Sequence, residues 1–201
     1  SNVATVSVVR GGPQPVHEFP LDSDPGWAVT GDWAFGDPAG IGSHNGDPSS
    51  GFTGTNVYGY NLAGDYPSNM TAEYLTTTAI DLADATDTSV EFQRWLGVES
   101  ATYDHAVLEV SANGVDWTTV WENDTIAISE SAWSLQSHDI SAVADNQPTV
   151  YLRWVMGSTD GTVTYPGWNI DDVRIWGALP TQGCLAAPGE ATGLVFAANN
   201  H

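Results

Sequence analysis

Apolar and polar side chains alternate with a period of two residues over much of this chain. The clearest runs are residues 90–98, 106–111 and 150–156, where apolar side chains recur at alternate positions. Successive side chains of a β-strand point to opposite faces of the sheet, so this period indicates strands with one face turned to a core. No segment keeps an apolar stripe of helical period over three turns. The pattern therefore predicts an all-β chain.

Turn residues separate the alternating runs. Asn113-Gly114 lies between two such runs and predicts a β-hairpin, and Thr159-Asp160-Gly161 marks a second turn. With short strands and many aromatic residues for the interior, we expect an antiparallel β-sandwich, most simply a jelly roll.

The length suits one such domain with flanking segments. A chain of 201 residues can hold a single sandwich with a sizeable core. We expect the domain to span residues 13–177. Residues 1–12 are expected to be the end of a preceding module or an added strand, and the Pro- and Gly-rich start of 178–201 indicates a linker followed by the opening of a further β-module. Cys184 is the single cysteine, so no disulfide forms within the chain.

The charge balance excludes several partners. Four Arg and no Lys stand against 25 acidic residues, for a net charge of −21. Such a surface repels nucleic acid and anionic membranes, and it favours divalent cations or a high-salt medium. No apolar run approaches the roughly 20 residues of a membrane-spanning helix, so we expect no membrane insertion.

Two adjacent carboxylates interrupt the last strand pattern, in residues 167–175. By alternation Asp171 shares a face with Val173 and Asp172 shares one with Arg174, so one carboxylate is expected to point inward. A buried carboxylate costs several kcal/mol unless it is neutralised. Its partner is therefore a bound cation or an arginine, Arg153 or Arg174.

Other acidic residues suit calcium. Residues 36–65 are rich in Gly, Asp, Asn and Ser and include Asp47 and Asp65. A long segment of this kind is functional, ordered by an ion or disordered, and clustered oxygens suit Ca²⁺. The alternative is that these residues only form turns. Glu99 and Asp104 flank a turn and are candidates for a second site, against the alternative of a solvated turn.

Signatures of catalysis are missing. The five His residues do not form His-Glu-x-x-His, and no Gly-x-Ser-x-Gly elbow is present. Cys184 has no nearby His, and although any two carboxylates could act as a glycosidase pair, abundance alone does not define one. We expect no enzymatic activity.

The aromatic residues leave a binding role open. Trp33, Trp121 and Trp133 are candidates for stacking against a sugar ring, because an exposed aromatic face beside polar groups is what a sugar requires. Trp95 is out of phase with Val90, Phe92 and Leu96. The alternative for each Trp is a place in the core.

A resemblance to a known family rests on a series of short motifs. They are Glu18-Phe19, Asp24-Pro25-Gly26-Trp27, Trp33-Ala34-Phe35-Gly36, Gly51-Phe52-Thr53-Gly54-Thr55-Asn56-Val57, Leu62-Ala63-Gly64-Asp65-Tyr66, Tyr103-Asp104-His105, Val110-Ser111-Ala112-Asn113-Gly114, Trp117, Trp133, Asp139-Ile140-Ser141 and Gly167-Trp168-Asn169-Ile170-Asp171-Asp172-Val173. Together they cover roughly residues 16–177 and resemble the MAM-like jelly-roll modules of large secreted bacterial proteins. That group includes cleaved-adhesin domains and modules appended to metallopeptidases of the immune-inhibitor-A kind.

The resemblance implies an accessory, calcium-binding module at the bacterial surface or outside the cell. It also implies that carboxylates near the first strand, Glu18, Asp22 and Asp24, share a calcium ion with Asp171 or Asp172. The family's usual second Gly after Tyr-Asp is replaced here by His105-Ala106.

Two functions follow from this reading. The first is a non-catalytic module that binds calcium and mediates adhesion or binding to an extracellular glycan or surface polymer, next to neighbouring modules of the same chain. The second is a structural spacer or stabilising domain of a secreted peptidase, with no ligand beyond calcium.

Overall fold

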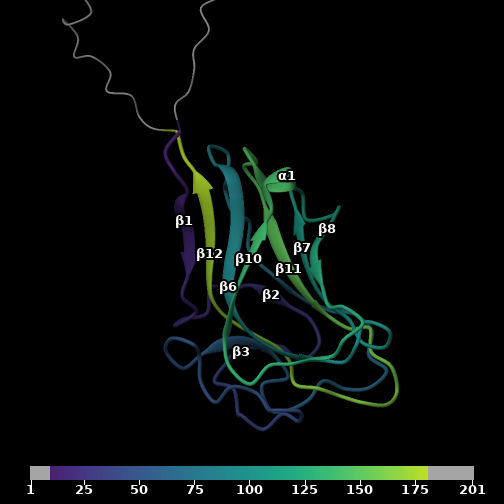
Figure 1. The fold of residues 1–201 in the computed structure, drawn as a ribbon. Helices are drawn as coiled ribbons and strands as arrows, with labels where there is room; N and C mark the ends of the chain where they lie inside the picture. The colour runs from purple at the N-terminus through teal and green to yellow at the C-terminus, as the bar shows by residue number, and fades with distance from the viewer. Residues whose placement is uncertain (1–9, 181–201) are drawn as a thin grey trace, which may run out of the picture.

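The structure, a computed structural model, describes residues 10–180. Two antiparallel β-sheets pack face to face as an all-β jelly-roll sandwich, which confirms the predicted fold class (Figure 1). Most of the segment 1–12, expected to be the end of a preceding module or an added strand, lies outside the described residues. So does most of the expected linker and further module, residues 181–201 with Cys184.

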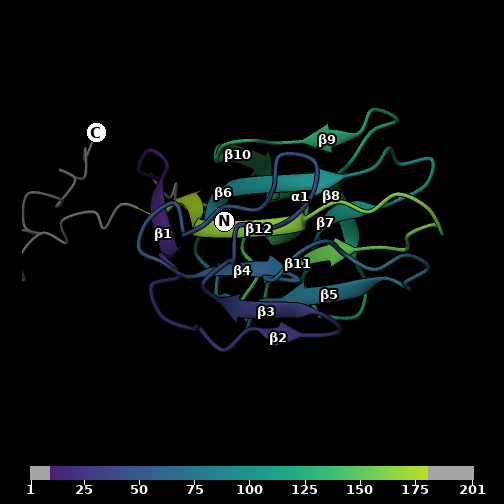
Figure 2. The same cartoon turned by 90° about the horizontal axis from the view of Figure 1, so that it is seen from below.

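The larger sheet is built around one long strand. Its seven strands are β1 (Gln14–Phe19), β3 (Trp33–Gly36), β4 (Val57–Tyr60), β6 (Thr86–Val98), β9 (Ile128–Ser129), β10 (Ser134–Asp139) and β12 (Gly167–Ala178). The main order is β10-β6-β12-β4-β3, with β1 added to β12 and β9 added to β6 (Figure 2). On the side of β12 away from β6, β4 pairs with its beginning and β1 with its end.

The smaller sheet has the order β2-β5-β11-β7-β8. Its strands are β2 (Ala28–Val29), β5 (Glu73–Thr76), β7 (Ala106–Ser111), β8 (Thr118–Glu122) and β11 (Tyr151–Met156). One helical turn, α1 (Ser141–Ala144), precedes β11. The strands β6, β7 and β11 match the three runs of alternating residues.

The predicted hairpin joins β7 to β8. Val110 pairs with Thr118, and Gly114 in the turn has a φ of +73°. The Asn113 side chain accepts the backbone N–H groups of Val115 and Asp116 at 2.8 and 2.9 Å. Asn-Gly thus forms the turn because Asn bonds the local backbone and Gly tolerates a positive φ.

Aromatic side chains fill the space between the sheets. Trp27 stacks on Tyr58 and on Trp154, with ring centroids 5.2 and 5.7 Å apart. Phe92 meets the Trp154 ring edge-on at 5.4 Å, and Trp154 and Trp168 are fully buried. These large rings supply the core of a chain that has no internal disulfide.

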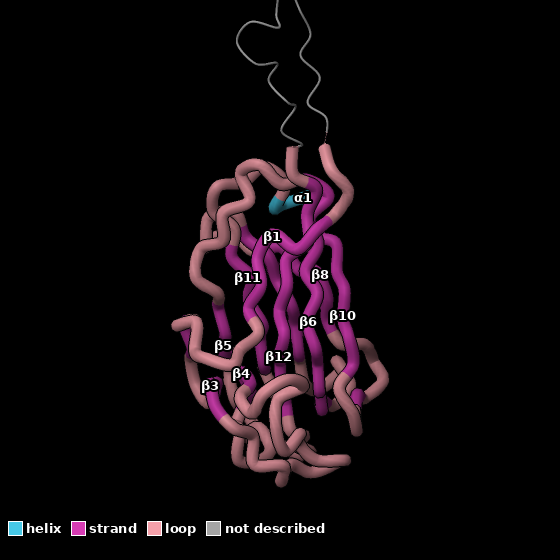
Figure 3. Tube along the Cα trace, turned by 90° about the vertical axis from the view of Figure 1, so that its left-hand side faces the viewer, coloured by secondary structure: helices cyan, strands magenta, loops and turns pink. Residues whose placement is uncertain are grey.

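The two ends of the sandwich differ. Arg10 forms a β-bridge with Pro180, so the described part of the chain begins and finishes at the same end. The long loops, including those that follow β6 and β11, gather at the opposite end (Figure 3). No described helix has the length and apolar character needed to cross a membrane.

The segment 36–65 contains a strand, which corrects the expectation of one long loop. All four residues of β4 are buried. Tyr58 and Tyr60 point into the core cluster, and Gly59 lies on the other face, where a Cβ would meet Leu62 and the Asn169 side chain. The β-prone aromatic residues outweigh the turn residues around them. Residues 37–56 remain a loop, which packs on the outer face of the larger sheet.

Candidate functional site

Three carboxylates meet at the loop end of the sandwich. Oxygen atoms of Glu99, Asp104 and Asp160 lie within 4.8 Å of one another, and within residues 10–180 no other group of three acidic, His or Cys side chains meets this criterion. Glu99 directly follows β6, Asp104 precedes β7, and Asp160 lies in the loop after β11. Residues from two connections, β6–β7 and β11–β12, thus converge on one point.

Asp104 forms the buried base of this cluster. It has no exposed surface. Tyr66 donates its hydroxyl to Asp104 Oδ2 at 2.5 Å, and the backbone N–H of Asp160 donates to Oδ1 at 2.8 Å. Burial, followed by the hydrogen bond to Asp104, raises the pKa of Tyr66, so the phenol stays protonated as a donor.

Glu99 adds an oxygen that lacks a partner. Its Oε2 is shielded from solvent and accepts no hydrogen bond. Burial and the charges of Asp104 and Asp160 raise the pKa of Glu99, while His44 acts in the opposite direction. Oxygen ligands of this kind, gathered at like charge, are the donor set that hard divalent cations such as Ca²⁺ bind.

The arginines cannot neutralise this cluster, because all four are engaged elsewhere. Arg94 pairs with Glu130 at 2.7 Å, Arg153 with Glu109 at 2.5 Å and Arg174 with Glu18 at 3.3 Å. Arg10 donates to the carbonyl oxygens of Asp84 and Ala178 and to the side chain of Asn146. The alternative that Arg153 or Arg174 pairs with Asp171 or Asp172 is therefore wrong.

A β-bulge changes the orientation expected for the two aspartates of β12. The register with β6 shifts between Asp171 and Arg174, and Asp172 has a φ of +47°. Ile170 and Val173 both lie in the core, whereas strict alternation would separate them. Asp171 thus shares the outer face with Asn169 and not with Val173, because the bulge moves the alternation by one residue.

Loop 37–56 buries both carboxylates. Thr53 donates its backbone N–H to Asp171 Oδ2 and its hydroxyl to Asp172 Oδ1, each at 3.0 Å. A Cβ on Gly51 would lie 2.8 Å from the Asn56 carbonyl oxygen and 2.9 Å from Asp171 Oδ2, so oxygens gather at this glycine. Burial raises the pKa of Asp171 to about 6. A calcium site here stays a prediction.

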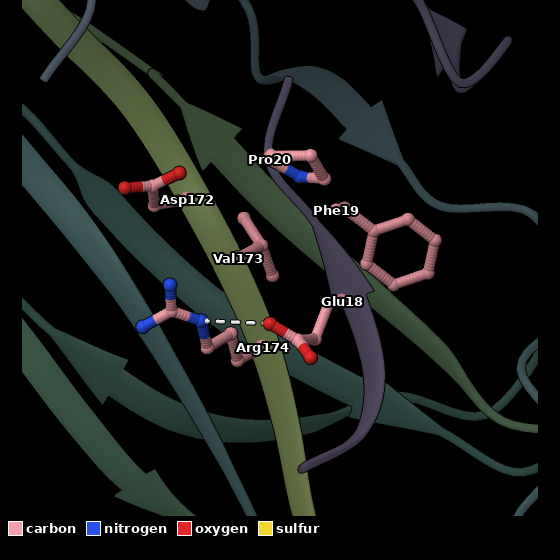
Figure 4. A pocket seen from close by; sticks show the side chains of 6 residues that line it. All are labelled: Glu18, Phe19, Pro20, Asp172, Val173 and Arg174. Atoms are coloured by element: carbon pink, nitrogen blue, oxygen red, sulfur yellow. Dashed lines mark hydrogen bonds and ion pairs between the residues drawn. The ribbon is translucent and has the colours of Figure 1, made fainter. Parts of the chain in front are cut away.

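The carboxylates near the first strand have other partners. Glu18 reaches Arg174, and Figure 4 shows Asp172 pointing away from Glu18. Asp24 accepts the Tyr58 hydroxyl at 2.6 Å and the Gly26 N–H at 2.7 Å, and the Tyr58 bond in particular lowers the pKa of Asp24. Asp22 lies against Gly54 in the loop that covers Asp171.

Asp47 lies in loop 37–56, and Asp65 binds the backbone of the same loop. Asp65 Oδ1 accepts the backbone N–H of Ser43 at 2.7 Å. Asp47 is 7% exposed and accepts the side-chain amide of Asn169 at 3.0 Å. Burial and, to a smaller extent, the charge of Asp65 raise the pKa of Asp47 to about 6.

The three candidate Trp residues occupy different environments. Trp33 is 3% exposed and belongs to the core cluster. Trp121 is partly buried, packs edge-on against Trp168 and lies under the Arg94 guanidinium. Trp133 is partly buried and meets Trp95 edge-on at 6.1 Å.

A different aromatic group crosses the outer face of the smaller sheet. The Arg153 guanidinium carbon lies 4.0 Å from the Trp117 ring centre and 4.5 Å from that of Tyr74. We call Tyr74, Arg153, Trp117 and Glu109 the aromatic row. The sequence alone does not single out Tyr74 or Trp117 as binding residues, because the row forms only when β11 pairs with β5 and β7, and β7 pairs with β8.

No family model matches the chain, and no curated protein matches its sequence. Several solved structures are similar in fold. The K3 cleaved adhesin domain of Lys-gingipain from Porphyromonas gingivalis is 16% identical, with 81% of this chain and 98% of that one covered and a TM-score of 0.42. The CBM22-1 xylan-binding domain of Paenibacillus barcinonensis Xyn10C is 13% identical, with 88% and 99% covered and a TM-score of 0.45.

A third similar structure is the C-terminal CBM6 of the laminarinase LamC from Zobellia galactanivorans, at 13% identity. The alignment covers 79% of this chain and 97% of the CBM6 chain, with a TM-score of 0.43. These are accessory domains of a sandwich type, and the MAM-like name stays a resemblance. The fold assignment rests on the two sheets described above.

Proposed function

We propose that the chain is a non-catalytic, calcium-binding accessory module of a larger secreted or surface bacterial protein, and that it binds an extracellular glycan or surface polymer. The observation that carries the calcium binding is the meeting of Glu99, Asp104 and Asp160 without an arginine partner. The proposal for a polymer ligand rests on the aromatic row.

A divalent cation explains how three carboxylates can lie so close together. Like charges at this separation repel strongly when solvent is excluded, as it is around Asp104. Ca²⁺ accepts about six to eight oxygen ligands in flexible geometry, so three carboxylates from two loops can share one ion. Glu99, Asp104 and Asp160 would hold the ion, which would supply positive charge and cross-link the β6–β7 and β11–β12 connections.

A calcium titration tests this part of the proposal. An ion that binds only the folded state adds about 2.7 kcal/mol to the free energy of unfolding at a hundredfold excess over Kd. We expect a higher melting midpoint with calcium than with chelator, and weaker binding by isothermal titration in Asp160→Asn. The control Asp87→Asn changes an exposed acidic residue outside the cluster and should bind as the original chain does. An unchanged midpoint would overturn the calcium proposal.

The aromatic row is suited to a sugar polymer. Trp117 and Tyr74 are partly exposed, and they contact the Arg153 guanidinium, which is ion-paired with the Glu109 carboxylate at 2.5 Å. Sugars are bound by apolar ring surfaces next to a few oriented polar groups. A shallow sheet face provides only a small contact area, so we expect weak binding.

A glycan array in the presence of calcium tests this second part. Glycan binding should be lost in Trp117→Ala. It should be kept in the control Trp133→Ala, because Trp133 packs against Trp95 of the larger sheet. If the original chain binds calcium but no glycan or surface polymer, the result would favour the spacer function. Turnover of a peptide or polysaccharide that a single carboxylate or His substitution abolishes would overturn the non-catalytic assignment.

A further inference from the structure

Loop 37–56 is attached to the outer face of the larger sheet by buried polar contacts. Trp95 on β6 donates its indole N–H to the Gly46 carbonyl oxygen at 2.9 Å. Its neighbour across the strands, Asn169 on β12, donates its side-chain amide to Asp47 Oδ1 at 3.0 Å. The loop thus covers Asn169, which is 1% exposed, and Asp47 itself is 7% exposed.

Two oxygens in this buried contact are left without partners. Asp47 Oδ2 and Asn169 Oδ1 are both shielded from solvent, and neither accepts a hydrogen bond of normal geometry. The Gly42 backbone approaches the Asp47 carboxylate, which offsets only part of the rise in its pKa. A buried acceptor without a partner is costly, and two in adjacent side chains call for a common explanation.

Glycines allow the backbone to approach both oxygens. A Cβ on Gly42 would lie 2.7 Å from Asp47 Oδ2, and a Cβ on Gly59 would lie 2.8 Å from Asn169 Oδ1. Side chains at these positions would displace the two oxygens. The surroundings therefore hold a carboxylate oxygen, approached by the Gly42 backbone, and an amide oxygen at the sheet surface, and neither has a hydrogen bond of normal geometry.

The local charge favours a cation. Asp65 lies close enough for its charge to raise the pKa of Asp47, and the four arginines are engaged elsewhere. A carboxylate oxygen and an amide oxygen are hard ligands of the kind that Ca²⁺ prefers. An arginine or lysine side chain could also neutralise Asp47, but none of the described residues places one beside it.

We propose that Asp47 Oδ2 and Asn169 Oδ1 are ligands of a further calcium-class ion, separate from the Glu99, Asp104 and Asp160 centre, and that this ion fastens loop 37–56 to the larger sheet. The carboxylate belongs to the loop and the amide to β12, so the ion cross-links them. The proposal does not require the chain to bind a glycan.

Isothermal titration of the whole chain with Ca²⁺ tests the site by stoichiometry. Asp47→Asn should lose one bound calcium equivalent relative to the original chain, whereas Asp160→Asn should keep this ion and weaken the other. Asp87→Asn serves as the matched control for removing one negative charge. Unchanged stoichiometry in Asp47→Asn would overturn the proposal and would indicate a protonated Asp47 that needs no metal.

A second variant separates metal binding from a structural role. Asn169→Asp replaces the amide donor by a second carboxylate, so the metal-free chain should be less stable, and calcium should restore stability with a lower Kd than in the original chain. A purely structural hydrogen bond predicts a loss of stability that calcium leaves unchanged, and that result would also overturn the proposal.

Amide hydrogen exchange gives a local measurement. Calcium should slow exchange in residues 42–56 of the original chain and of Asp160→Asn, and it should fail to do so in Asp47→Asn. Equal protection of this loop in all three chains would contradict the assignment. If Asp160→Asn binds calcium as the original chain does while Asp47→Asn loses one calcium equivalent, the centre at Glu99, Asp104 and Asp160 is excluded and the Asp47 site stands. The two proposals can therefore be told apart.

Discussion

Tyr66 and Asp104 are joined by a hydrogen bond of 2.5 Å between two almost fully buried side chains. Tyr66 also accepts the backbone N–H of Glu99 at 3.2 Å. One phenol therefore orients two of the three carboxylate residues of the candidate metal centre. Its hydroxyl is a side-chain donor to Asp104, next to the backbone N–H of Asp160.

Replacing Tyr66 by Phe should destabilise the metal-free chain. The loss of a buried hydrogen bond to a carboxylate lowers the free energy of unfolding by about 1.5–3 kcal/mol. Urea unfolding in chelator measures the effect. Tyr103→Phe is the control, because Tyr103 is 50% exposed, and it should leave stability unchanged within about 0.5 kcal/mol. Equal stability of the two variants would contradict the role given to Tyr66.

The stability of the metal-free chain should fall as the pH rises from about 4 to about 6. Burial raises the pKa of Asp47 and Asp171 from 3.8 to about 6, so in this range the folded state binds more protons than the unfolded state. Each group then lowers the free energy of unfolding by up to about 3 kcal/mol above pH 6.

Urea unfolding at several pH values, with and without calcium, measures this dependence. Calcium should reduce the fall because a bound cation favours the ionised carboxylates. In the absence of calcium, the Asp47→Asn variant should show a smaller fall in stability over this pH range than the original chain. A metal-free stability that rises over the same range, with no difference in Asp47→Asn, would show that these groups are not destabilising when ionised.

Asp171→Asn and Asp172→Asn should lower calcium affinity more than Asp87→Asn does. The first two carboxylates are buried beneath loop 37–56 beside backbone oxygens, and Asp87 is exposed. Removing a charged ligand from a buried site weakens cation binding far more than removing a solvated charge. Titration of the three variants with Ca²⁺ decides the matter, and equal affinities would exclude an ion at the bulge.

Arg153→Lys should destabilise the chain more than Arg174→Lys. The Arg153 guanidinium lies between two aromatic rings and binds Glu109, and its side chain is 20% exposed, against 45% for Arg174. Lysine keeps the charge but loses the planar stacking, at a cost of about 1–2 kcal/mol for the two rings. Thermal unfolding compares them. Equal midpoints would show that the aromatic row is loosely held and unsuited to a rigid binding face.

The candidate centre was only partly predictable. The sequence indicates Glu99 and Asp104 as a candidate site because they flank one turn, whereas Asp160 has the sequence context of an ordinary turn residue in Thr159-Asp160-Gly161. The pairing of β7 with β11 brings their connecting loops together, and no local pattern contains that information.

The sequence by itself determined the strands β6, β7 and β11, the hairpin at Asn113-Gly114 and the need to neutralise buried acidic residues without lysine, since periodicity, turn chemistry and composition are local properties. Tertiary structure decided which carboxylates meet. It turned Asp171 to the outer face through the bulge at Asp172, paired Asn169 with Asp47 and assembled the aromatic row. These relationships depend on strand register and on how a loop packs over a sheet, which are set by contacts between residues far apart in the chain.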